Sequence, residues 1–364
     1  MFDHRRIAIV INSLAGGGAE KVMLTLAQEF IKLGHEAHFF VLQNNGEYQV
    51  PTHIPLHVCF EKGAKGLDSV FKVKLNARSL KNTIDAVQHE IGKFDLFLSN
   101  LDTSNQLMTR TGLSPLYCVV HNSVEQELIR QKKLGPIAYF KMWRAKHCLS
   151  GQRLITVSKG IKKEIEQVGR IQPKSVQTIY NPFDVNDIKS QSEKVNTSIP
   201  SEEYLIHVGR VAKQKRHDIL FQALKEMESN IKLVLLCNNP KKALKLAKKH
   251  GVSDRIILPG FQANPYQWIK RARALVLSSD YEGLPTVIIE ALICGTPVIS
   301  TNCPHGPSEI LTGDLAENLA PVQDPKSLAT KIDNLLKKPK VTIDAELCKR
   351  IEAEEIAKQY LSLK

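Results

Sequence analysis

The 364-residue sequence lacks the marks of several classes of protein. No apolar run approaches the roughly 18 residues that a membrane-spanning helix needs, and the N-terminal run Ile7–Ile11 is too short for the core of a signal peptide. The seven cysteines are scattered without a C-x-x-C pair, which argues against a disulfide framework and favours a reduced, cytoplasmic protein. There is no H-E-x-x-H and no D-x-D motif, so we expect no metal ion.

Acidic residues are fewer than basic ones, 37 against 50, which gives a net charge of +13. Such a balance favours phosphate-rich partners, namely nucleic acid, anionic lipid or a pyrophosphate substrate. An ordinary lysine-rich surface explains the charge equally well, so charge alone does not choose among these alternatives.

Apolar residues alternate between strand-like and helix-like runs, which is typical of an α/β protein. In the first half we expect strands at Ile7–Ile11, His38–Leu42, Asp95–Ser99, Leu116–Val120, Leu154–Val157 and Val176–Ile179, and helices at Glu20–Leu33, Leu75–Ile91 and from about Gly160. In the second half we expect strands at Tyr204–Val208, Lys232–Cys237, Ile256–Leu258, Ala274–Leu277 and Pro297–Ser300, and helices at His217–Met227, Lys241–His250, Thr286–Cys294 and Ala345–Leu363.

A polar stretch, Ile188–Ser198, separates the two halves and reads as a linker or an exposed loop. Each half has the pattern of a doubly wound Rossmann-like domain. We therefore expect a first domain of residues 1–183 plus 346–364 and a second of residues 184–345. Ligands would meet the carboxyl ends of the strands in a cleft between them.

The most informative stretch runs from Glu282 to Glu290. Gly283 lets the backbone approach a ligand closely, and Pro285 suits the first position of a helix. The free N–H groups there, with the helix dipole, make an anion site suited to a phosphate. Glu282 lies at its mouth and Glu290 about two turns into the helix. Because carboxylates accept hydrogen bonds from hydroxyls, this arrangement suits a nucleotide-sugar better than a free nucleotide.

Three further segments follow expected strands. The loop Gly16–Gly18 opens the first helix and offers backbone N–H groups to a ligand, or is simply a tight turn. Arg210 and Lys215 follow Tyr204–Val208, where they would neutralise a pyrophosphate unless they are ordinary surface cations. His121 follows Leu116–Val120 and either contacts a sugar hydroxyl or is a hydrogen-bonded structural histidine.

The segment from Arg130 to Lys146 mixes cations with aromatic residues. Six of its seventeen residues are Lys or Arg and none is acidic. This pattern suits docking on an anionic membrane, with the aromatic side chains either at the interface or in the core. The residues assigned to this surface are Arg130, Lys132, Lys133, Lys141, Trp143, Arg144 and Lys146.

Taken in order, these motifs resemble the GT-B-fold retaining glycosyltransferases of family 4, over nearly the whole chain. The resemblance rests on Gly16–Gly18, Asn181-Pro182, Gly209-Arg210 with Lys215, Gly260-Phe261, the pair Glu282 and Glu290, and the run Cys303–Leu311. That last run is similar to one in bacterial members that build lipid-linked glycans and lipopolysaccharide. Two departures stand out: Asn238-Asn239 replaces a Gly-x-Gly turn, and Arg216 occupies a position where glycine is common.

The resemblance implies a role for each motif. It places the donor diphosphate on Arg210 and Lys215, the transferred sugar on Glu282, and the ribose on Glu290. It implies that His121 lies beside the reacting carbon and that the final helix crosses back to the first domain. The other implied donor contacts are Gly17, Gly18, Gly260, Phe261, Gly283, Leu284, Pro285 and Thr286.

We therefore expect a retaining, metal-independent glycosyltransferase without a cofactor. It would move a hexose or N-acetylhexosamine from a UDP-sugar to a lipopolysaccharide, capsule or polyprenyl-linked glycan at the cytoplasmic membrane face. A UDP-sugar epimerase or hydrolase of the same fold is the rival enzyme. A nucleic-acid-binding protein using the basic helix Lys241–Lys249 is the rival binding module, although a solvated surface helix accounts better for that segment.

Overall fold

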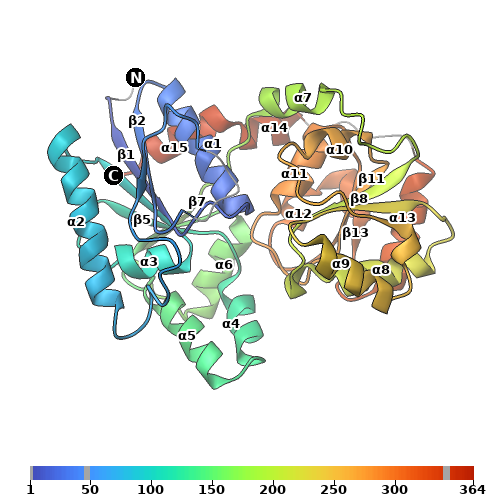
Figure 1. Cartoon of the computed structure of the whole chain (residues 1–364), viewed down its shortest axis with the longest axis horizontal. Coiled ribbons are helices and arrows are strands. Elements are labelled where there is room, and N and C mark those ends of the chain that lie inside the picture. Colours follow the sequence, from blue (N-terminus) through green and yellow to red (C-terminus); the bar gives the residue numbers. More distant parts are fainter. Residues whose placement is uncertain (1–2, 45–49, 339–344) are drawn as a thin grey trace. The chain divides into compact units, whose positions relative to one another are not determined.

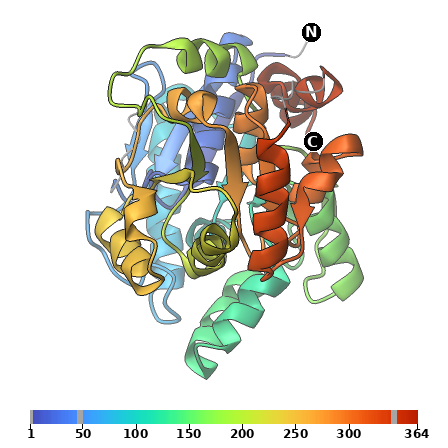
Figure 2. The same ribbon diagram turned by 90° about the vertical axis from the view of Figure 1, so that its right-hand side faces the viewer.

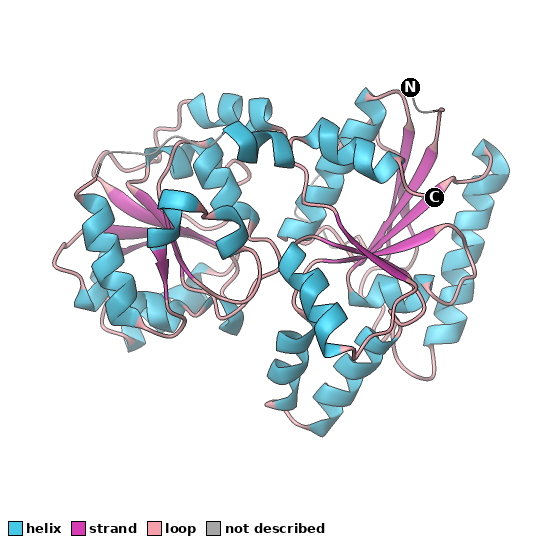
Figure 3. Cartoon of the chain, turned by 180° about the vertical axis from the view of Figure 1, so that it is seen from behind, coloured by secondary structure: helices cyan, strands magenta, loops and turns pink. Residues whose placement is uncertain are grey.

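The computed structural model describes residues 3–44, 50–338 and 345–364. The chain divides into two compact units, one of Met1–Phe183 with Arg350–Lys364 and one of Asp184–Lys349. We call them unit 1 and unit 2. The units meet at 183/184 and 349/350, where the sequence-based expectation was 183/184 and 345/346. Each unit contains a parallel sheet with helices on both faces (Figure 3), so the expected α/β class is confirmed.

The sheet of unit 1 has seven strands in the order β3-β2-β1-β4-β5-β6-β7 (Figure 1). The interior strand β1 is fully buried from Ile7 to Ile11, as the run of apolar residues predicts for a strand covered on both faces. The strands are β1 (Arg6–Ile11), β2 (Glu36–Val41), β3 (Leu56–Val58), β4 (Leu96–Asn100), β5 (Leu116–Val120), β6 (Arg153–Thr156) and β7 (Ser175–Thr178).

Helices connect most of the parallel strands of unit 1, because parallel strands need a crossover between them. They are α1 (Gly18–Lys32), α2 (Val73–Ile91), α3 (Asp102–Met108), α4 (Val124–Lys132), α5 (Pro136–His147), α6 (Lys159–Val168) and α15 (Ala353–Leu361). In the part of the chain that the structure describes, no helix has both the length and the apolar character needed to cross a bilayer.

The C-terminal segment returns to unit 1, as the sequence predicts, but not as one helix. It forms α14 (Ala345–Ile351) and α15, separated by Glu352. The backbone of Phe183 donates to Ile351 and accepts from Ala353 at 2.8 and 3.0 Å, which interrupts the helix. The ring of Tyr360 then packs edge-on against Phe30 of α1. The expectation of one helix from Ala345 to Leu363 was therefore wrong, because a pairing with a distant residue breaks it.

The sheet of unit 2 has six strands in the order β10-β9-β8-β11-β12-β13. Figure 2 turns this unit toward the viewer. The strands are β8 (Tyr204–Val208), β9 (Lys232–Leu236), β10 (Ile256–Ile257), β11 (Ala274–Leu277), β12 (Val298–Thr301) and β13 (Leu319–Ala320). The α-helices are α7 (Val185–Glu193), α8 (His217–Glu226), α9 (Pro240–Lys249), α10 (Tyr266–Arg271), α11 (Thr286–Ile293), α12 (Pro307–Ile310) and α13 (Pro325–Leu336). Three 3₁₀ turns complete the described part of the unit: Lys213–Lys215, Ser253–Arg255 and Gly313–Asn318.

The first six residues of the stretch expected to be a linker or an exposed loop, Ile188–Glu193, belong to α7, which corrects the expectation for them, whereas residues 194–198 form no helix or strand. The side chain of Asp184 accepts a hydrogen bond from the Asp187 backbone at 2.9 Å and so caps the start of α7. Val185 and Ile188 are buried on one face of the helix. With so few large apolar residues the helical period is faint, so the helix depends on its cap and on packing within unit 2.

Candidate functional site

The carboxyl ends of β8 and β11 bring together two residues that the sequence singles out. The two strands are neighbours in the parallel sheet, so the loops that follow them meet at one edge. Lys215 Nζ lies 2.8 Å from Glu282 Oε1, and the two side chains are only 18% and 9% exposed. In the described structure these two charges therefore satisfy each other, although they come from segments far apart in the chain.

Backbone and side-chain hydrogen bonds connect these two loops to each other. The Gln214 side chain donates to the Tyr281 carbonyl at 2.7 Å, and the Asp280 N–H donates to the Gln214 carbonyl at 2.9 Å. The Ser278 hydroxyl donates to the Lys215 carbonyl at 2.8 Å. The spacing between Lys215 and Glu282 is thus set by their backbones as well as by their own attraction.

Arg216 is a member of this site whose role the sequence did not reveal. Its φ of 47° is left-handed, a conformation that glycine adopts easily and other residues rarely adopt, which fits the glycine that the resemblance implies at this position. Its guanidinium pairs with Asp218 and with Asp280 at 2.9 Å. The hydrogen bonds that Arg216 donates to the Asp218 carboxylate outweigh burial and raise the pKa of the guanidinium. Arg216 thus anchors the loop that carries Glu282.

The loop Gly283–Pro285 leads into α11, whose start has no side-chain cap. The expected start of this helix at Thr286 is confirmed, and Pro285 is the residue before the helix and not its first residue. Thr286 therefore opens the helix, with its N-terminal N–H groups and the positive end of the dipole beside Gly283. This arrangement can accept a phosphate next to the Lys215–Glu282 pair.

Gly306 packs against that loop, and it belongs to the run Cys303–Leu311, the part of the resemblance to which no individual role was assigned. A Cβ on Gly306 would lie 2.3 Å from Pro285 Cδ and 3.0 Å from the Gly283 carbonyl. The Glu282 N–H also donates to the Pro304 carbonyl at 3.0 Å. The segment after β12 is therefore packed so closely on the loop that only glycine fits at position 306.

The other expected donor contacts are distributed around the same edge. Arg210 is exposed and forms no ion pair within the described residues. Glu290 is buried in α11. Gly260 has a left-handed φ of 86°, and Phe261 is 39% exposed beside it. Asn239, one of the two departures from the family pattern, caps α9 by accepting from the Lys242 backbone at 2.9 Å.

Buried groups behind Lys215 are neutral. Burial lowers the pKa of His217 to about 4, with Lys215 adding to the effect, and it lowers the pKa of His207 well below its ordinary value. Burial also raises the pKa of the Cys303 thiol, which stays protonated. The two histidines and the thiol are therefore uncharged neighbours of the Lys215–Glu282 ion pair.

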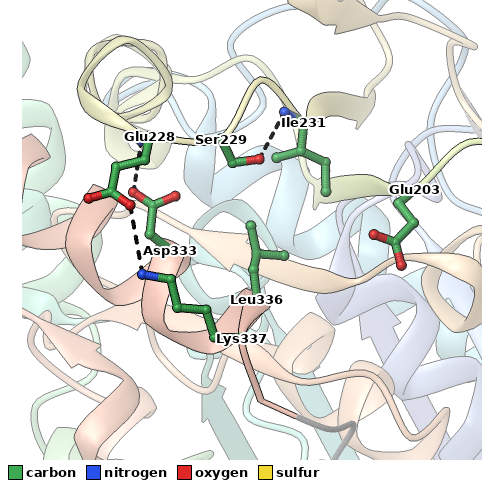
Figure 4. Close-up of a pocket in the computed structure, with 7 residues that line it drawn as sticks. All are labelled: Glu203, Glu228, Ser229, Ile231, Asp333, Leu336 and Lys337. Carbon is green, nitrogen blue, oxygen red and sulfur yellow. Dashed lines mark hydrogen bonds and ion pairs between the residues drawn. The ribbon is translucent and has the colours of Figure 1, made fainter.

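A separate hollow of about 520 Å³ lies near the amino ends of β8 and β9 (Figure 4). Asp333 accepts from the Glu228 backbone at 3.0 Å, and Lys337 lies 3.7 Å from the Glu228 carboxylate. Glu203 also lines the hollow. Three carboxylates against one lysine disfavour an anionic ligand, so phosphate chemistry belongs to the opposite, cationic edge.

In unit 1, His121 follows β5 and is bonded to Asn100 at the end of β4. The Asn100 amide nitrogen donates to the carbonyls of Val10 and Leu98, so its oxygen accepts from His121 Nε2 at 2.9 Å. His121 therefore carries its proton on Nε2, and Nδ1 is an acceptor. Burial lowers the pKa of His121 to about 4. A neutral acceptor of this kind can receive a hydrogen bond from a hydroxyl, but it is not a cationic acid.

Lys146 belongs to a buried network next to His121, not to an exposed cationic face. It is 6% exposed and lies 2.6 Å from Asp102 and 2.5 Å from Glu127. Burial alone would lower the pKa of Lys146, but the two carboxylates outweigh it and raise the pKa. Glu127 also accepts from Asn122, the neighbour of His121, at 3.1 Å. The expectation that Lys146 lies on a membrane-facing surface was wrong.

Arg144 also points inward, toward Gln106 and the backbone carbonyl of Asp68. Trp143 is half-buried and stacks between Phe140 and His147. The cations that remain exposed on the α4–α5 hairpin are Lys132, Lys133 and Lys141, while Arg130 is half-buried. The hairpin is shown in green in Figure 1.

The glycine loop of unit 1 packs closely against the side chain of Glu20 in the first turn of α1. Gly17 precedes α1 and Gly18 is the first helical residue. The carboxylate of Glu20 lies so close that a Cβ on Gly17 would be 2.3 Å from its Oε2. An acid in the first turn interacts favourably with the helix dipole. A ligand that used these N–H groups would meet Glu20 there.

Two family models match consecutive parts of the chain. The model "Glycosyltransferase Family 4" matches residues 16–187, and "Glycosyl transferases group 1" matches residues 187–356. The chain belongs to the GT-B glycosyltransferases of family 4. It is therefore a glycosyltransferase, and the expected resemblance is confirmed.

Curated relatives and solved structures agree with this membership. The chain is 24% identical to N-acetylgalactosamine-N,N'-diacetylbacillosaminyl-diphospho-undecaprenol 4-alpha-N-acetylgalactosaminyltransferase of Campylobacter jejuni, over 93% of this glycosyltransferase and 92% of the relative. It is 30% identical to lipopolysaccharide 1,6-galactosyltransferase of Escherichia coli over 45% of this chain and 47% of that one. The structure of Anabaena HepE in complex with UDP-glucose superposes with a TM-score of 0.75 at 19% identity, covering 98% of both chains.

We expect Gly306→Ala to disturb the loop Gly283–Pro285. The φ of 93° is strained for alanine, and the new methyl group would overlap Pro285. Binding of UDP, the donor nucleotide that the resemblance implies, should weaken about tenfold or more when measured by titration calorimetry, which corresponds to about 1.4 kcal/mol. Gly313→Ala is the matched control, because Gly313 is also left-handed but has open space around it. Equal UDP affinity of the two variants would contradict this account.

We expect the stability of the enzyme to fall as the pH drops from 6.5 toward 4, in part through His121. In that range the unfolded chain binds a proton on this histidine, whereas the folded chain, with a pKa of about 4, does not. His121→Gln keeps an amide donor for Asn100 and should reduce the loss by about 2 kcal/mol at pH 4.5. Urea unfolding at several pH values measures this, with the exposed His89→Gln as control. An unchanged pH dependence in His121→Gln would argue against a buried neutral His121.

Proposed function

We propose that the protein is a retaining glycosyltransferase that uses a UDP-sugar. The observation that carries the proposal is the ion pair of Lys215 and Glu282 beside the uncapped start of α11. A diphosphate needs cationic and N–H partners, and a sugar needs a carboxylate for its hydroxyls. The cation, the N–H groups and the carboxylate are all present within the two hydrogen-bonded loops that follow β8 and β11. The UDP-glucose complex of the structurally similar HepE supports this choice of donor.

Donor binding would exchange partners within this pair. The diphosphate takes the place of Glu282 as the partner of Lys215, and Arg210 adds a second cation from solvent. Glu282 is then available to accept hydrogen bonds from the transferred sugar. Because the two loops are connected to each other, the exchange requires movement of side chains and not of the backbone.

The proposed chemistry is a front-face displacement. The bond between the sugar C1 and the β-phosphate oxygen breaks, and the acceptor oxygen bonds to C1 on the same face. The acceptor proton passes to the departing phosphate oxygen. Lys215, Arg210 and the start of α11 stabilise the charge that develops on UDP, and we propose that they do so without a metal ion.

For the acceptor we propose a lipid-carried glycan, reached at the cytoplasmic face of the membrane. The names of the relatives, which include an undecaprenol-linked N-acetylgalactosaminyltransferase and a lipopolysaccharide galactosyltransferase, support this class. The α4–α5 hairpin supplies a docking surface, with exposed Lys132 and Lys133 beside Ile137 and Phe140, which are 87% and 57% exposed. Lysines attract anionic lipid, and apolar side chains enter the interface.

We expect Lys215→Ala and Glu282→Ala each to lower the rate of transfer by about 10²–10³, the loss typical of removing one group that stabilises developing charge. The measurement is UDP release from a panel of UDP-sugars with membrane lipid extract as acceptor. Lys213→Ala, an exposed lysine in the same loop, is the control and should retain wild-type turnover. Normal turnover by a folded Lys215→Ala protein would refute the proposed site. Rapid UDP-sugar consumption without acceptor would favour an epimerase or hydrolase.

We expect the double variant Lys132→Glu/Lys133→Glu to lose binding to anionic vesicles. Each lysine near an anionic surface contributes about 1 kcal/mol, so the combined change should weaken binding by about 30-fold or more. Lys248→Glu/Lys249→Glu on α9 changes the net charge equally and should bind as the wild type does. Co-sedimentation with vesicles measures both. If only the α9 variant loses binding, the assignment of the docking surface to the α4–α5 hairpin is refuted.

A further inference from the structure

A second exposed apolar group lies where the chain enters α2. Val70, Phe71 and Leu75 are 60%, 96% and 67% exposed. The inward face of α2 is formed by other residues, namely Val73, Ala77, Leu80 and Ile84. A single exposed apolar side chain is ordinary, but three within six residues, one of them an almost fully exposed phenylalanine, form a patch that calls for a partner.

The charges around this patch are almost all positive. Five exposed cations lie between residues 61 and 78: Lys62, Lys65, Lys72, Lys74 and Arg78. The two acids in the same range are Glu61 and Asp68, and Asp68 is buried. A symmetric contact with a second copy of the chain would place these cations opposite one another, which is unfavourable. The composition instead matches an anionic lipid surface.

Asp68 ties this loop to the α4–α5 hairpin. Its backbone carbonyl accepts from Arg144, and its carboxylate lies 3.5 Å from Lys141 Nζ, both on α5. Figures 1 and 3 show the start of α2 and the hairpin on the same side of unit 1, where the strands of its sheet end. The inward-pointing Arg144 thus links two surfaces that each carry exposed apolar groups and lysines.

We propose that the loop from Asp68 to Leu75 is a second membrane contact that inserts Phe71 into the interface of an anionic bilayer. The flanking lysines bind lipid phosphates while the ring leaves water. The inference rests on the membrane attachment proposed for the hairpin. One contact leaves unit 1 free to tilt on the surface, whereas two contacts joined through Asp68 fix the orientation in which a lipid-carried acceptor is met.

The test uses the full-length protein and flotation with vesicles of phosphatidylcholine and phosphatidylglycerol. Phe71→Asp should weaken partitioning about tenfold or more, the change expected when one aromatic side chain is no longer buried. Val195→Asp is the matched control, because Val195 is 91% exposed in unit 2 and the charge change is the same. In a second readout, Phe71→Trp should be quenched by lipids brominated on their acyl chains, whereas Val195→Trp should not.

The outcomes separate this inference from the proposed function. Wild-type partitioning by Phe71→Asp, or no quenching of Phe71→Trp, would overturn the second contact even if Lys132→Glu/Lys133→Glu fails to bind. Loss in Phe71→Asp with normal binding by the lysine variant would support the second contact and refute the hairpin. A change only in oligomeric state, seen by analytical ultracentrifugation, would assign Phe71 to self-association and overturn the inference. Transfer to a water-soluble acceptor should be unchanged by Phe71→Asp.

Discussion

The candidate site of unit 2 depends on keeping a lysine and a carboxylate 2.8 Å apart and largely out of water. A pair like this contributes little to stability, because losing solvent offsets much of the attraction. The pair is instead preorganised, because both charges are already placed and partly desolvated before a ligand binds. The surrounding hydrogen bonds join backbone to backbone and side chain to backbone, so they persist when either charge changes its partner. Preorganisation of this kind makes charge stabilisation effective at the moment of reaction.

Unit 1 uses the same principle in a different place. Lys146 links Asp102, Glu127 and, through Glu127, Asn122, so α3, α4, α5 and the loop after β5 share one buried network. Removing one member of such a network leaves a buried charge without its partner, which typically destabilises by about 3–5 kcal/mol. His121 is fixed on its other side by Asn100. The His121 side chain is thus held by Asn100 at the end of β4, while its chain neighbour Asn122 belongs to the Lys146 network.

Local sequence patterns were sufficient for the fold but not for contacts between distant segments. Most strands and about half of the helices follow from apolar runs, but the short strands β3 and β13 and the helices α3, α4, α7, α10, α12 and α13 were not among the expected elements. Glu282, Lys215 and Gly283 follow from motifs in order. The break at Glu352 could not be predicted from local sequence, because it results from backbone pairing with Phe183, which is distant in the chain. The burial of Lys146 could not be predicted either, since its partner Asp102 is 44 residues away and a lysine among cations resembles a surface residue. The requirement for glycine at position 306 could be recognised only from its close packing against Pro285 in the structure.

Arg216 shows why a departure from a family pattern carries information. A glycine there would take the left-handed conformation without strain, whereas a side chain at such a position costs about 1–3 kcal/mol and persists only when its surroundings over-determine it. Those surroundings are Asp218 and Asp280. Gln323, also left-handed, donates to the same Asp280 at 3.1 Å. Two strained residues thus converge on one carboxylate, two positions before Glu282. Strain held in place by ion pairs stiffens this loop more than a glycine would, and so it restricts how far Glu282 can move when Lys215 leaves it.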